Sequence, residues 1–460
     1  MDKNTAVLHA AYASWMAGAQ LRQQRQRNKR FTYGDQWGDT TLGTDGRTIT
    51  ERERFTDNGQ APLTNNLLRG LVKTIVGRFR NEHLQTPPAD EKLRAAATFN
   101  QLDELDSRAL EEFLIAGCCV QRIDHDMVQG RDTALVRNVN LNHFFINSTR
   151  DTRGWDCELV GQCHDLTLPQ LLHLVAAGSR RKAAWVRSLY CEQAAERTTH
   201  FITSIGSDTA TGTDFWRARD GRCRAIEVWT LESHEVMWCH NRKTAQLTMT
   251  PYNGRRPKAA PDVTMRWDIA TTWHCRWFSP MGDLLVEYDS PWPHHQHPFV
   301  FKFYPLTDGE VHSFIEDTID QQKYVNRLIS LVESIMMNSA KGVLLYPENA
   351  LPDGYTWEDV RSAWSSTGGI LPYNPQYGDA RPEQIACNGT NIGAYDMISL
   401  QLRLLNEVSG VSGALQGKSD NSSSATVYEM QAHNAAVALT DIFDTFNAFR
   451  NARNTLLLNH

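Results

Sequence analysis

The sequence predicts an α+β fold that is suited to assembly with copies of itself. Apolar residues recur every three or four positions over 313–338 and over 425–458, which is the spacing of two long α-helices. From 201 to 303, β-type runs separated by turn residues replace this pattern. A helix over 391–409 and the helix over 313–338 bracket a compact insertion. This design favours an oligomer over a closed monomer, and head-to-tail interfaces that close on themselves give a ring.

Composition and charge narrow the class of protein. The chain has 460 residues, 41% of them hydrophobic, which is enough for two or three domains with a sizeable core. The net charge of −6 argues against a protein that grips nucleic acid over a basic surface. The nine cysteines form no CxxC pair and indicate a reducing compartment. We expect a cytoplasmic product, because no apolar run reaches the length of a membrane span and no secretory leader is recognisable.

The N-terminal third is predicted to be mainly helical. An amphipathic helix over 4–30 ends in a basic run, for which we expect a solvated helix end, with contact to a partner or to nucleic acid as the alternative. The run consists of Arg22, Arg25, Arg27, Lys29 and Arg30. The segment FTYGDQW at 31–37 follows, then a polar loop, a helix over 64–81 and a helix over 90–116 that Gly117 ends.

The middle of the chain is predicted to alternate between strands and short helices. Helices are expected over 168–177 and 183–195. The expected strands are 118–123, 134–139, 155–164, 225–231, 235–240, 246–249, 271–278 and 299–304.

The helix over 313–338 has a marked start and an unusual polar face. Ser313 and Glu316 form a capping box, and Lys341-Gly342 marks the stop. The helix spans roughly 39 Å. Its polar face carries Gln322, Asn326, Ser330, Ser334 and Asn338. A core helix rarely carries so many small polar residues, whereas a helix packed against copies of itself could use them.

After this helix the pattern predicts a small α/β insertion and two more helices. The insertion contains strands over 343–346 and 370–373 and a short helix over 357–364 with Thr356 as its cap. The helix over 391–409 ends at Gly410. A loop of small residues then leads to the helix over 425–458, which spans roughly 50 Å.

No motif predicts catalysis, a metal or a cofactor. The segment GALQGKS at 413–419 resembles a phosphate-binding loop, but one residue is missing between its glycines and it follows a helix instead of a strand. The histidines at 294, 295 and 297 lie in a proline-rich stretch, for which we expect a surface turn. Cys157, Cys163 and His164 are weaker candidates, and Cys118-Cys119 are expected to be buried small hydrophobes.

The order of several segments resembles the portal proteins of tailed bacteriophages. The segments are FTYGDQW at 31–37, NNLLRGLVKTIVGRF at 65–79, GCCVQRID at 117–124, NLNHFFINSTRDTRGWDCELVGQ at 140–162, LTLPQLLHLV at 166–175 and HPFVFKFYPLTDGEVHSFIEDTIDQQKYVNRLIS at 297–330. The similarity covers roughly 30–450. YGDQW and the pattern Asp320-Gln-Gln-x-x-x-Asn326 are the most specific parts. Another virion connector or structural protein is the first alternative, and a nucleic-acid-processing enzyme is the second.

The resemblance implies a portal-like α+β subunit that assembles as a ring, usually of twelve copies, at one capsid vertex. Double-stranded DNA would enter through the ring, driven by the terminase large subunit, and leave into the tail. Capsid protein and a head-tail adaptor would be the other partners, and no membrane is involved. The expected location is the virion, with the host cytoplasm during assembly. Carried over by position, the parts are a wing at 1–312, stem helices at 313–338 and 391–410, a clip at 339–390, a tunnel loop at 411–424, and a tunnel helix with the start of a short or missing crown at 425–460.

This assignment suggests residues for each part. A conduit should hold DNA weakly, because each fixed cation that neutralises a phosphate adds affinity. We therefore expect a neutral or acidic stem wall and one mobile ring of cations and hydroxyl groups at the tunnel loop. The stem-wall candidates are Asp317, Asp320 and Arg327, and the tunnel-loop candidates are Lys418, Asn421, Ser422 and Ser423. Trp357 and Trp364 are candidates for a clip interface, and packing inside the clip's own core is the alternative. A sizeable crown or C-terminal barrel is expected to be absent from this chain.

Overall fold

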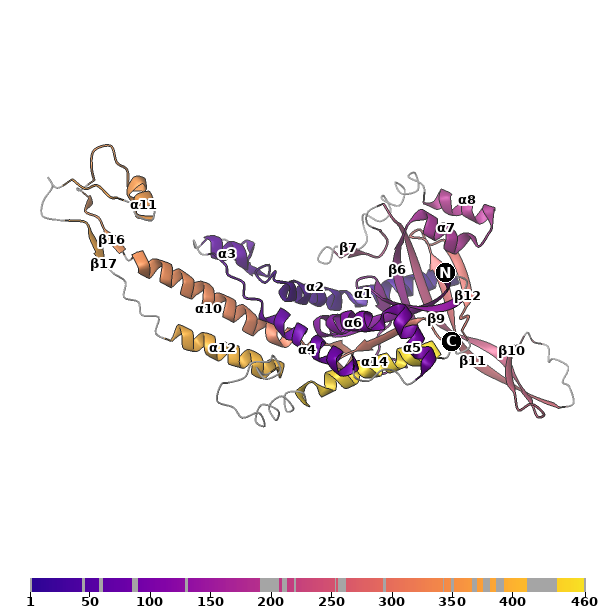
Figure 1. The fold of residues 1–460 in the computed structure, drawn as a ribbon. Helices are drawn as coiled ribbons and strands as arrows, with labels where there is room; N and C mark the ends of the chain where they lie inside the picture. The colour runs from indigo at the N-terminus through magenta and orange to yellow at the C-terminus, as the bar shows by residue number, and fades with distance from the viewer. Residues whose placement is uncertain are drawn as a thin grey trace. The chain divides into compact units, whose positions relative to one another are not determined.

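The computed structural model describes most of the chain in two compact units. It describes residues 2–43, 46–57, 61–84, 90–128, 131–190, 207–208, 213–218, 221–252, 254, 262–292, 295–341, 343–348, 351–365, 370–374, 381–385, 393–411 and 437–458. Unit 1 comprises 1–33, 68–318 and 409–460, and unit 2 comprises 34–67 and 319–408. Helices and strands both contribute (Figure 1), as the α+β expectation requires. No helix among the described residues is long and apolar enough to span a membrane.

Unit 1 is built on a six-stranded antiparallel sheet. The strand order is β12-β11-β9-β6-β5, with β10 on the far end of β9. The bounds are β5 Phe144–Ile146, β6 Leu159–Leu166, β9 Cys223–Asn241, β10 Leu247–Pro251, β11 Val263–Phe278 and β12 Leu284–Asp289. The predicted strands 225–231 and 235–240 are thus one long strand, β9, while β5 and β12 were not predicted. They were missed because neither shows the period-two alternation on which the strand predictions relied.

The first part of β9, residues 223–229, is buried on both faces of the sheet, which explains the nearly continuous apolar run there. Ala225 and Trp229 pack with α7 (Leu168–Ala176) and α8 (Arg180–Leu189) on one face. Ile226 and Val228 pack on the other face with residues of α1 (Lys3–Ala17). A strand covered on both sides loses the alternation of a half-exposed strand.

A buried charged residue, Glu227, lies between these apolar positions. It accepts hydrogen bonds from Arg122 and from the indole Nε1 of Trp229 (2.8 Å), and its carboxylate lies 2.7 Å from the ring Nε2 of His164. Burial raises the pKa of Glu227, but the charge of Arg122 and the contact with His164 outweigh this and lower the pKa to about 2. Glu227 is therefore held ionised by its partners. Cys163 points into the opposite core, so Cys157, Cys163 and His164 do not form a joint site.

A second sheet in unit 1 has the order β13-β3-β4. Its strands are β3 Cys118–Val128, β4 Arg131–Asn138 and β13 Phe299–Phe303. Helices α6 (Leu102–Ala116) and α14 (Thr440–Leu458) contact this sheet, and α2 (Ala19–Tyr33) contacts α6. Cys118 and Cys119 are buried, as expected. The remaining described elements of unit 1 are α4 Leu67–Leu84, α5 Glu91–Asn100, β7 Ser207–Asp208, β8 Thr213–Asp214, β14 Leu306–Thr307 and β15 Glu310–Val311. The first residue of α4, Leu67, is assigned to unit 2.

Two of the predicted long helices are broken. The helix expected over 4–30 ends at Gly18, after which α2 begins, because Gly18 leaves the helical conformation as the C-cap of α1. The helix expected over 90–116 breaks at Gln101, which adopts a left-handed conformation (φ 51°). Asp90 caps the start through its carboxylate and Gly117 ends it, as predicted.

The prediction of a solvated basic helix end is wrong for two of its five residues. Arg22 and Arg25 are buried in unit 1. Arg25 pairs with Glu112, and Arg22 stacks on the indole of Trp15, 3.9 Å from the ring centre, while donating to the carbonyl of Trp15 (2.7 Å). Both guanidinium groups thus have partners inside the fold, Trp15 for Arg22 and Glu112 for Arg25, and they are not part of a solvated helix end.

Unit 2 contains two long helices that are connected through a strand pair. Helix α10 (Glu316–Lys341) starts in unit 1 at the predicted capping box, where the Ser313 hydroxyl accepts from the Glu316 N–H at 3.3 Å, and it ends at Lys341 as predicted. Strands β16 (Val343–Leu345) and β17 (Glu383–Ile385) pair antiparallel, and α12 (Ala394–Ser409) follows. Between the strands lies α11 (Trp357–Ser365), capped by the Thr356 hydroxyl as predicted. The other elements of unit 2 are β1 Thr40–Leu42, β2 Thr48–Thr50 and α3 Glu51–Asp57.

One predicted strand of the insertion is wrong. Residues 370–373 form no strand, and their Ile370 is 88% exposed. Without a pairing partner or a covered face, an apolar run has nothing to hold it in a sheet. The strand that does pair with β16 is β17, whose polar sequence Glu-Gln-Ile gave no strand signal.

Candidate functional site

The polar face of α10 is buried in a hydrogen-bonded ladder within unit 2. Gln322, Asn326 and Ser330 are four residues apart, so they lie one above another on a single face of the helix. Each is at most 1% exposed. The expectation that this face packs against copies of the chain is therefore wrong for these three residues.

The ladder holds residues 63–67, where an extended segment runs into the first residue of α4. The backbone N–H of Leu63 donates to the Ser330 hydroxyl (2.9 Å), that of Asn65 to Asn326 Oδ1 (3.0 Å), and that of Leu67 to Gln322 Oε1 (2.9 Å). An extended segment and a helix start both leave backbone N–H groups without intrahelical partners. The amide and hydroxyl side chains supply these partners, which is why polar residues occupy the buried face.

The same ladder joins the two sequence patterns that carried the resemblance. Asn326 donates to Oε1 of Gln36, the glutamine of YGDQW, and Gln36 in turn donates to Asn66 Oδ1 (3.2 Å). The neighbouring Trp37 is buried and donates to the Thr64 hydroxyl (3.0 Å). The two patterns are thus parts of one packing interaction.

An ion-pair cluster continues the contact on the adjacent side of α10. Lys323 lies 2.9 Å from a carboxylate oxygen of Asp39 and 2.8 Å from one of Glu51. Arg327 also pairs with Glu51 at 2.9 Å, although 44% of its side chain is exposed. Of the three stem-wall candidates, Arg327 is therefore engaged within its own subunit, while Asp317 and Asp320 are exposed.

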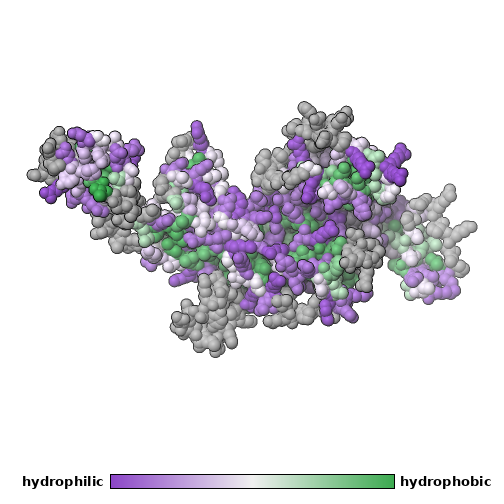
Figure 2. Space-filling model, turned by 45° about the horizontal axis from the view of Figure 1, so that its top comes forward, coloured by the Kyte–Doolittle hydropathy of each residue, from purple (hydrophilic) through white to green (hydrophobic). Residues whose placement is uncertain are grey.

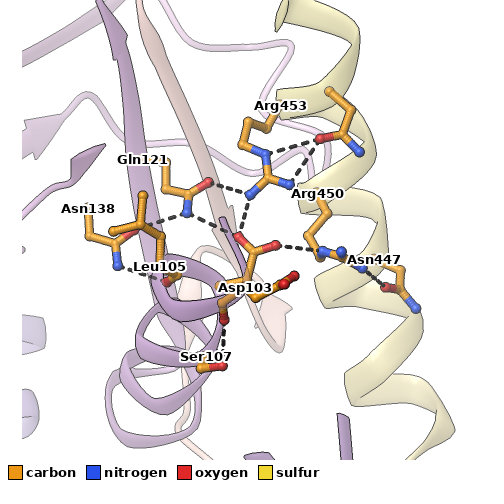
Figure 3. Close-up of polar contacts among 10 residues, drawn as sticks. Asp103, Leu105, Ser107, Gln121, Asn138, Asn447, Arg450 and Arg453 are labelled. Atoms are coloured by element: carbon orange, nitrogen blue, oxygen red, sulfur yellow. Dashed lines mark hydrogen bonds and ion pairs between the residues drawn. The ribbon is translucent and has the colours of Figure 1, made fainter. Parts of the chain in front are cut away.

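A second buried network, in unit 1, anchors α14. Figure 3 shows Arg450 and Arg453 projecting from α14 towards Gln121 on β3 and towards α6. Arg453 is 1% exposed and pairs with Asp106, which also accepts from Arg450 at 2.8 Å. Gln121 accepts from Arg453 at 3.3 Å and donates to Asp106 at 3.3 Å. Burial lowers the pKa of Arg453 while Asp106 raises it, so the ion pair offsets part of the desolvation.

Comparison with known families identifies the chain. A family model described as "Phage P22-like portal protein" matches residues 9–459. The chain belongs to this portal protein family. No curated protein matches it. The match covers nearly the whole sequence, so the resemblance seen in the order of the segments is confirmed. The protein is a structural portal that serves DNA packaging and ejection in a phage, and its family is structural and not enzymatic.

The portal's tunnel-loop candidates lie outside the described residues. These are Lys418, Asn421, Ser422 and Ser423, together with the whole GALQGKS segment. The described chain reaches Val411 and resumes at Val437, and Gly410 adopts the left-handed conformation (φ 65°) expected of a residue that ends a helix. The helix predicted over 425–458 is confirmed over 440–458 as α14.

The two tryptophans of the portal's insertion lie on α11, at different depths. Trp357 is 49% exposed and meets the ring of Tyr346 edge-on, with the ring centres 6.0 Å apart. Trp364 is partly buried, and Val360, between them on the helix, is buried. The structure thus leaves half of one indole available for contact.

The weak metal candidates have other roles. Among the described residues no group of three or more His, Cys, Asp or Glu side chains is arranged to hold a metal ion. His297 packs between Trp273 and Phe301, and His295 lies in a turn with a positive φ of 51°. His294 is outside the described residues.

Sequence reasoning missed most residues of both networks. Asp106, Gln121 and Arg453 gave no signal, because they are single polar residues far apart in the sequence. The i, i+4, i+8 spacing of Gln322, Asn326 and Ser330 was visible, but not its partner segment. For these three residues, burial against another segment of the same chain would have been a better prediction than contact with copies of the chain.

Proposed function

We propose that this portal protein assembles as a closed ring of twelve subunits at one capsid vertex and forms the channel for double-stranded DNA. The terminase large subunit, the capsid protein and a head-tail adaptor are its partners. A head-to-tail interface between identical subunits closes into such a ring when the rotation per subunit divides the circle.

The observation that supports this proposal is apolar surface on the two long helices of unit 2. Large apolar side chains are exposed along α10 and α12: Tyr324, Leu331 and Met336 on the first, and Tyr395, Met397, Leu400, Leu402 and Val408 on the second. Isolated exposed apolar residues are ordinary, but a series of them on long helices indicates an interaction surface. Neighbouring copies of the same helices would cover it.

The order of elements supports the assignment of parts. We assign α10 and α12 to the stem (313–338 and 391–410) and the α11 region between β16 and β17 to the clip (339–390). Because β16 and β17 pair, the chain leaves one stem helix and enters the other at the same strand pair. The wing is then 1–312, the tunnel loop 411–424, and the tunnel helix with the start of a short or missing crown 425–460.

The proposed roles of single residues follow from these parts. The tunnel wall would include Asp317, Asp320 and Arg327. Because Arg327 forms an ion pair with Glu51, the negative charge of Glu51 would offset the attraction of Arg327 for DNA phosphates. Lys418, Asn421, Ser422 and Ser423 would face DNA from the tunnel loop. Trp357 and Trp364 would contribute to the clip interface, which the half-exposed indole of Trp357 supports. The virion vertex would be the final location, reached from the host cytoplasm.

Electron microscopy of the purified protein tests the assembly. We expect rings with a central hole, and we expect Leu331→Glu and Leu400→Glu to abolish them, because a charge at a covered apolar contact is costly. Leu42→Glu is the matched control, since Leu42 is also exposed in unit 2 but lies on β1. Rings that persist in both stem variants would refute the interface, and compact monomers in the unaltered protein would refute the ring.

A further inference from the structure

A concentration of positive charge lies on the helical hairpin formed by α7 and α8 in unit 1. Residues 168–190 contain Arg180, Arg181, Lys182 and Arg187 and no Asp or Glu. All four side chains are exposed, and none forms an ion pair with a described carboxylate. In Figure 2, hydrophilic side chains project from this region beside hydrophobic ones. The segment is therefore basic, whereas the chain as a whole is acidic, with a net charge of −6.

The helices that carry these cations are packed against the core of unit 1. Leu171 and Val175 of α7 and Val186 of α8 are at most 1% exposed and belong to the core of the six-stranded sheet. The Ser179 hydroxyl caps α8, accepting from the Lys182 N–H at 3.4 Å. Arg180 and Arg187 are seven residues apart, so they lie on one face of α8, about 10 Å apart along its axis. These two charges are therefore presented in line on a packed helix.

The position of the cations does not serve the stability of α8. Arg180, Arg181 and Lys182 occupy its first turn, which contains no acidic residue. The N-terminus of a helix is the positive end of its dipole, so a cation there destabilises the helix where an anion would stabilise it. A bound polyanion would reverse this cost.

We propose that the exposed face of α8 binds the phosphate backbone of double-stranded DNA at a place distinct from the tunnel loop. A duplex presents one negative charge per about 1.7 Å of its axis, so the 10 Å row can face about six phosphate charges. Contacts from these cations to phosphate groups position a duplex but carry no sequence information, so the proposed contact is independent of sequence. At physiological salt, charges beyond about 8 Å are screened, so the acidic remainder of the chain does not cancel the patch.

An acidic protein segment is the competing occupant. Trp185 is 37% exposed beside the cations and could anchor such a segment. The duplex is favoured because three arginines and a lysine suit repeated phosphates, and because DNA is the polyanion that a portal serves. The proposal rests on membership of the portal family and not on the assignment of stem, clip or tunnel loop.

The test is the anisotropy of a short fluorescent DNA duplex of mixed sequence, titrated with the full-length protein between about 50 and 200 mM salt. For the triple variant Arg180→Gln, Arg181→Gln and Arg187→Gln we expect an affinity lower by at least about tenfold. The slope of log K against log salt should become shallower by about 0.9 for each phosphate that the variant no longer neutralises. The triple Arg→Lys variant should retain most of the affinity, because the charge is kept.

A control variant removes the same charge elsewhere in unit 1. Lys73→Gln, Lys92→Gln and Arg266→Gln neutralise three exposed cations on other elements. An equal loss of affinity in this control would overturn the proposal, because net charge alone would then explain the effect. A labelled polyglutamate peptide that binds the unaltered protein more tightly than the duplex does, and loses its binding in the α8 variant, would overturn it in favour of an acidic protein partner.

Particle shape and thermal stability distinguish loss of the α8 site from loss of assembly. The α8 variant should form the same particles as the unaltered protein under the electron microscope, and its melting temperature should be unchanged or slightly higher, because the opposing charges at the helix start are gone. Loss of DNA affinity with intact rings supports the α8 site. Unchanged affinity for DNA with intact rings would refute the α8 site without affecting the proposal of a ring.

Discussion

The buried ladder on α10 makes a quantitative prediction about Asn326. Its Oδ1 accepts from the backbone N–H of Asn65 at 3.0 Å and from Gln322 Nε2 at 3.0 Å, and its Nδ2 donates to Gln36. In Asn326→Ala the buried Gln36, which is 1% exposed, loses the amide that donates to its Oε1, and the N–H of Asn65 loses its acceptor. Leaving a buried polar group without such a partner costs about 1–3 kcal/mol, and the removed side-chain volume adds to that. We expect a loss of about 2–4 kcal/mol.

Hydrogen exchange read by mass spectrometry measures this loss where it occurs. Each 1.4 kcal/mol is a factor of about ten, so amides in the peptide covering 63–67 should exchange at least about thirtyfold faster in Asn326→Ala. Asp320→Ala is the control on the same helix, because Asp320 is exposed and should change stability by less than about 0.5 kcal/mol. If exchange over 63–67 is unchanged in Asn326→Ala, the ladder does not hold this segment and the reasoning fails.

Four further predictions follow from the structure and the proposed parts. Asp106→Ala leaves the buried Arg453 without its carboxylate and should cost about 3–5 kcal/mol, measured by urea unfolding, whereas a small effect would show that the pair is dispensable. Glu227→Gln should destabilise by about 3 kcal/mol at pH 7, since the pKa of Glu227 is lowered to about 2. That stabilisation is present above the unfolded pKa and disappears as the pH falls from about 4.5 towards 2, so unfolding curves of the two proteins should converge at low pH; a constant difference would contradict this. Lys418→Ala should reduce the DNA retained after packaging while rings persist, and normal retention would make the loop a linker. Deleting 339–390 should leave wing folding intact and abolish ring assembly or motor docking, and normal packaging by the deletion would contradict the clip assignment.

Local sequence patterns predicted much of the secondary structure because its causes are local. The capping box of Ser313 and Glu316, the cap of α5 by Asp90 and the stop at Gly117 each satisfy backbone groups a few residues away. Such contacts are encoded in short stretches and can be read directly. Breaks such as the one at Gln101 were missed because a non-glycine residue with a positive φ carries no compositional signal.

The order of motifs likewise determined the family. YGDQW and the Asp320–Asn326 pattern are the most specific segments, but neither is decisive alone. Their order along the chain indicated a portal protein, and the family match over 9–459 agrees. The structure adds the physical reason why the two patterns occur together: Gln36 and Asn326 are hydrogen-bonded to each other.

What only the tertiary structure decided is where the polar groups lie. The sequence gives no sign that three arginines are buried, because arginine is typical of the surface. Only the fold shows that Arg22 binds Trp15, Arg25 pairs with Glu112 and Arg453 pairs with Asp106. The polar face of α10 indicated contact with another helix until the segment 63–67 was seen to supply its partners. Hydrophobic periodicity reports which face of an element is apolar, but a buried polar group is stabilised by partners that can be hundreds of residues away, and no local pattern records them.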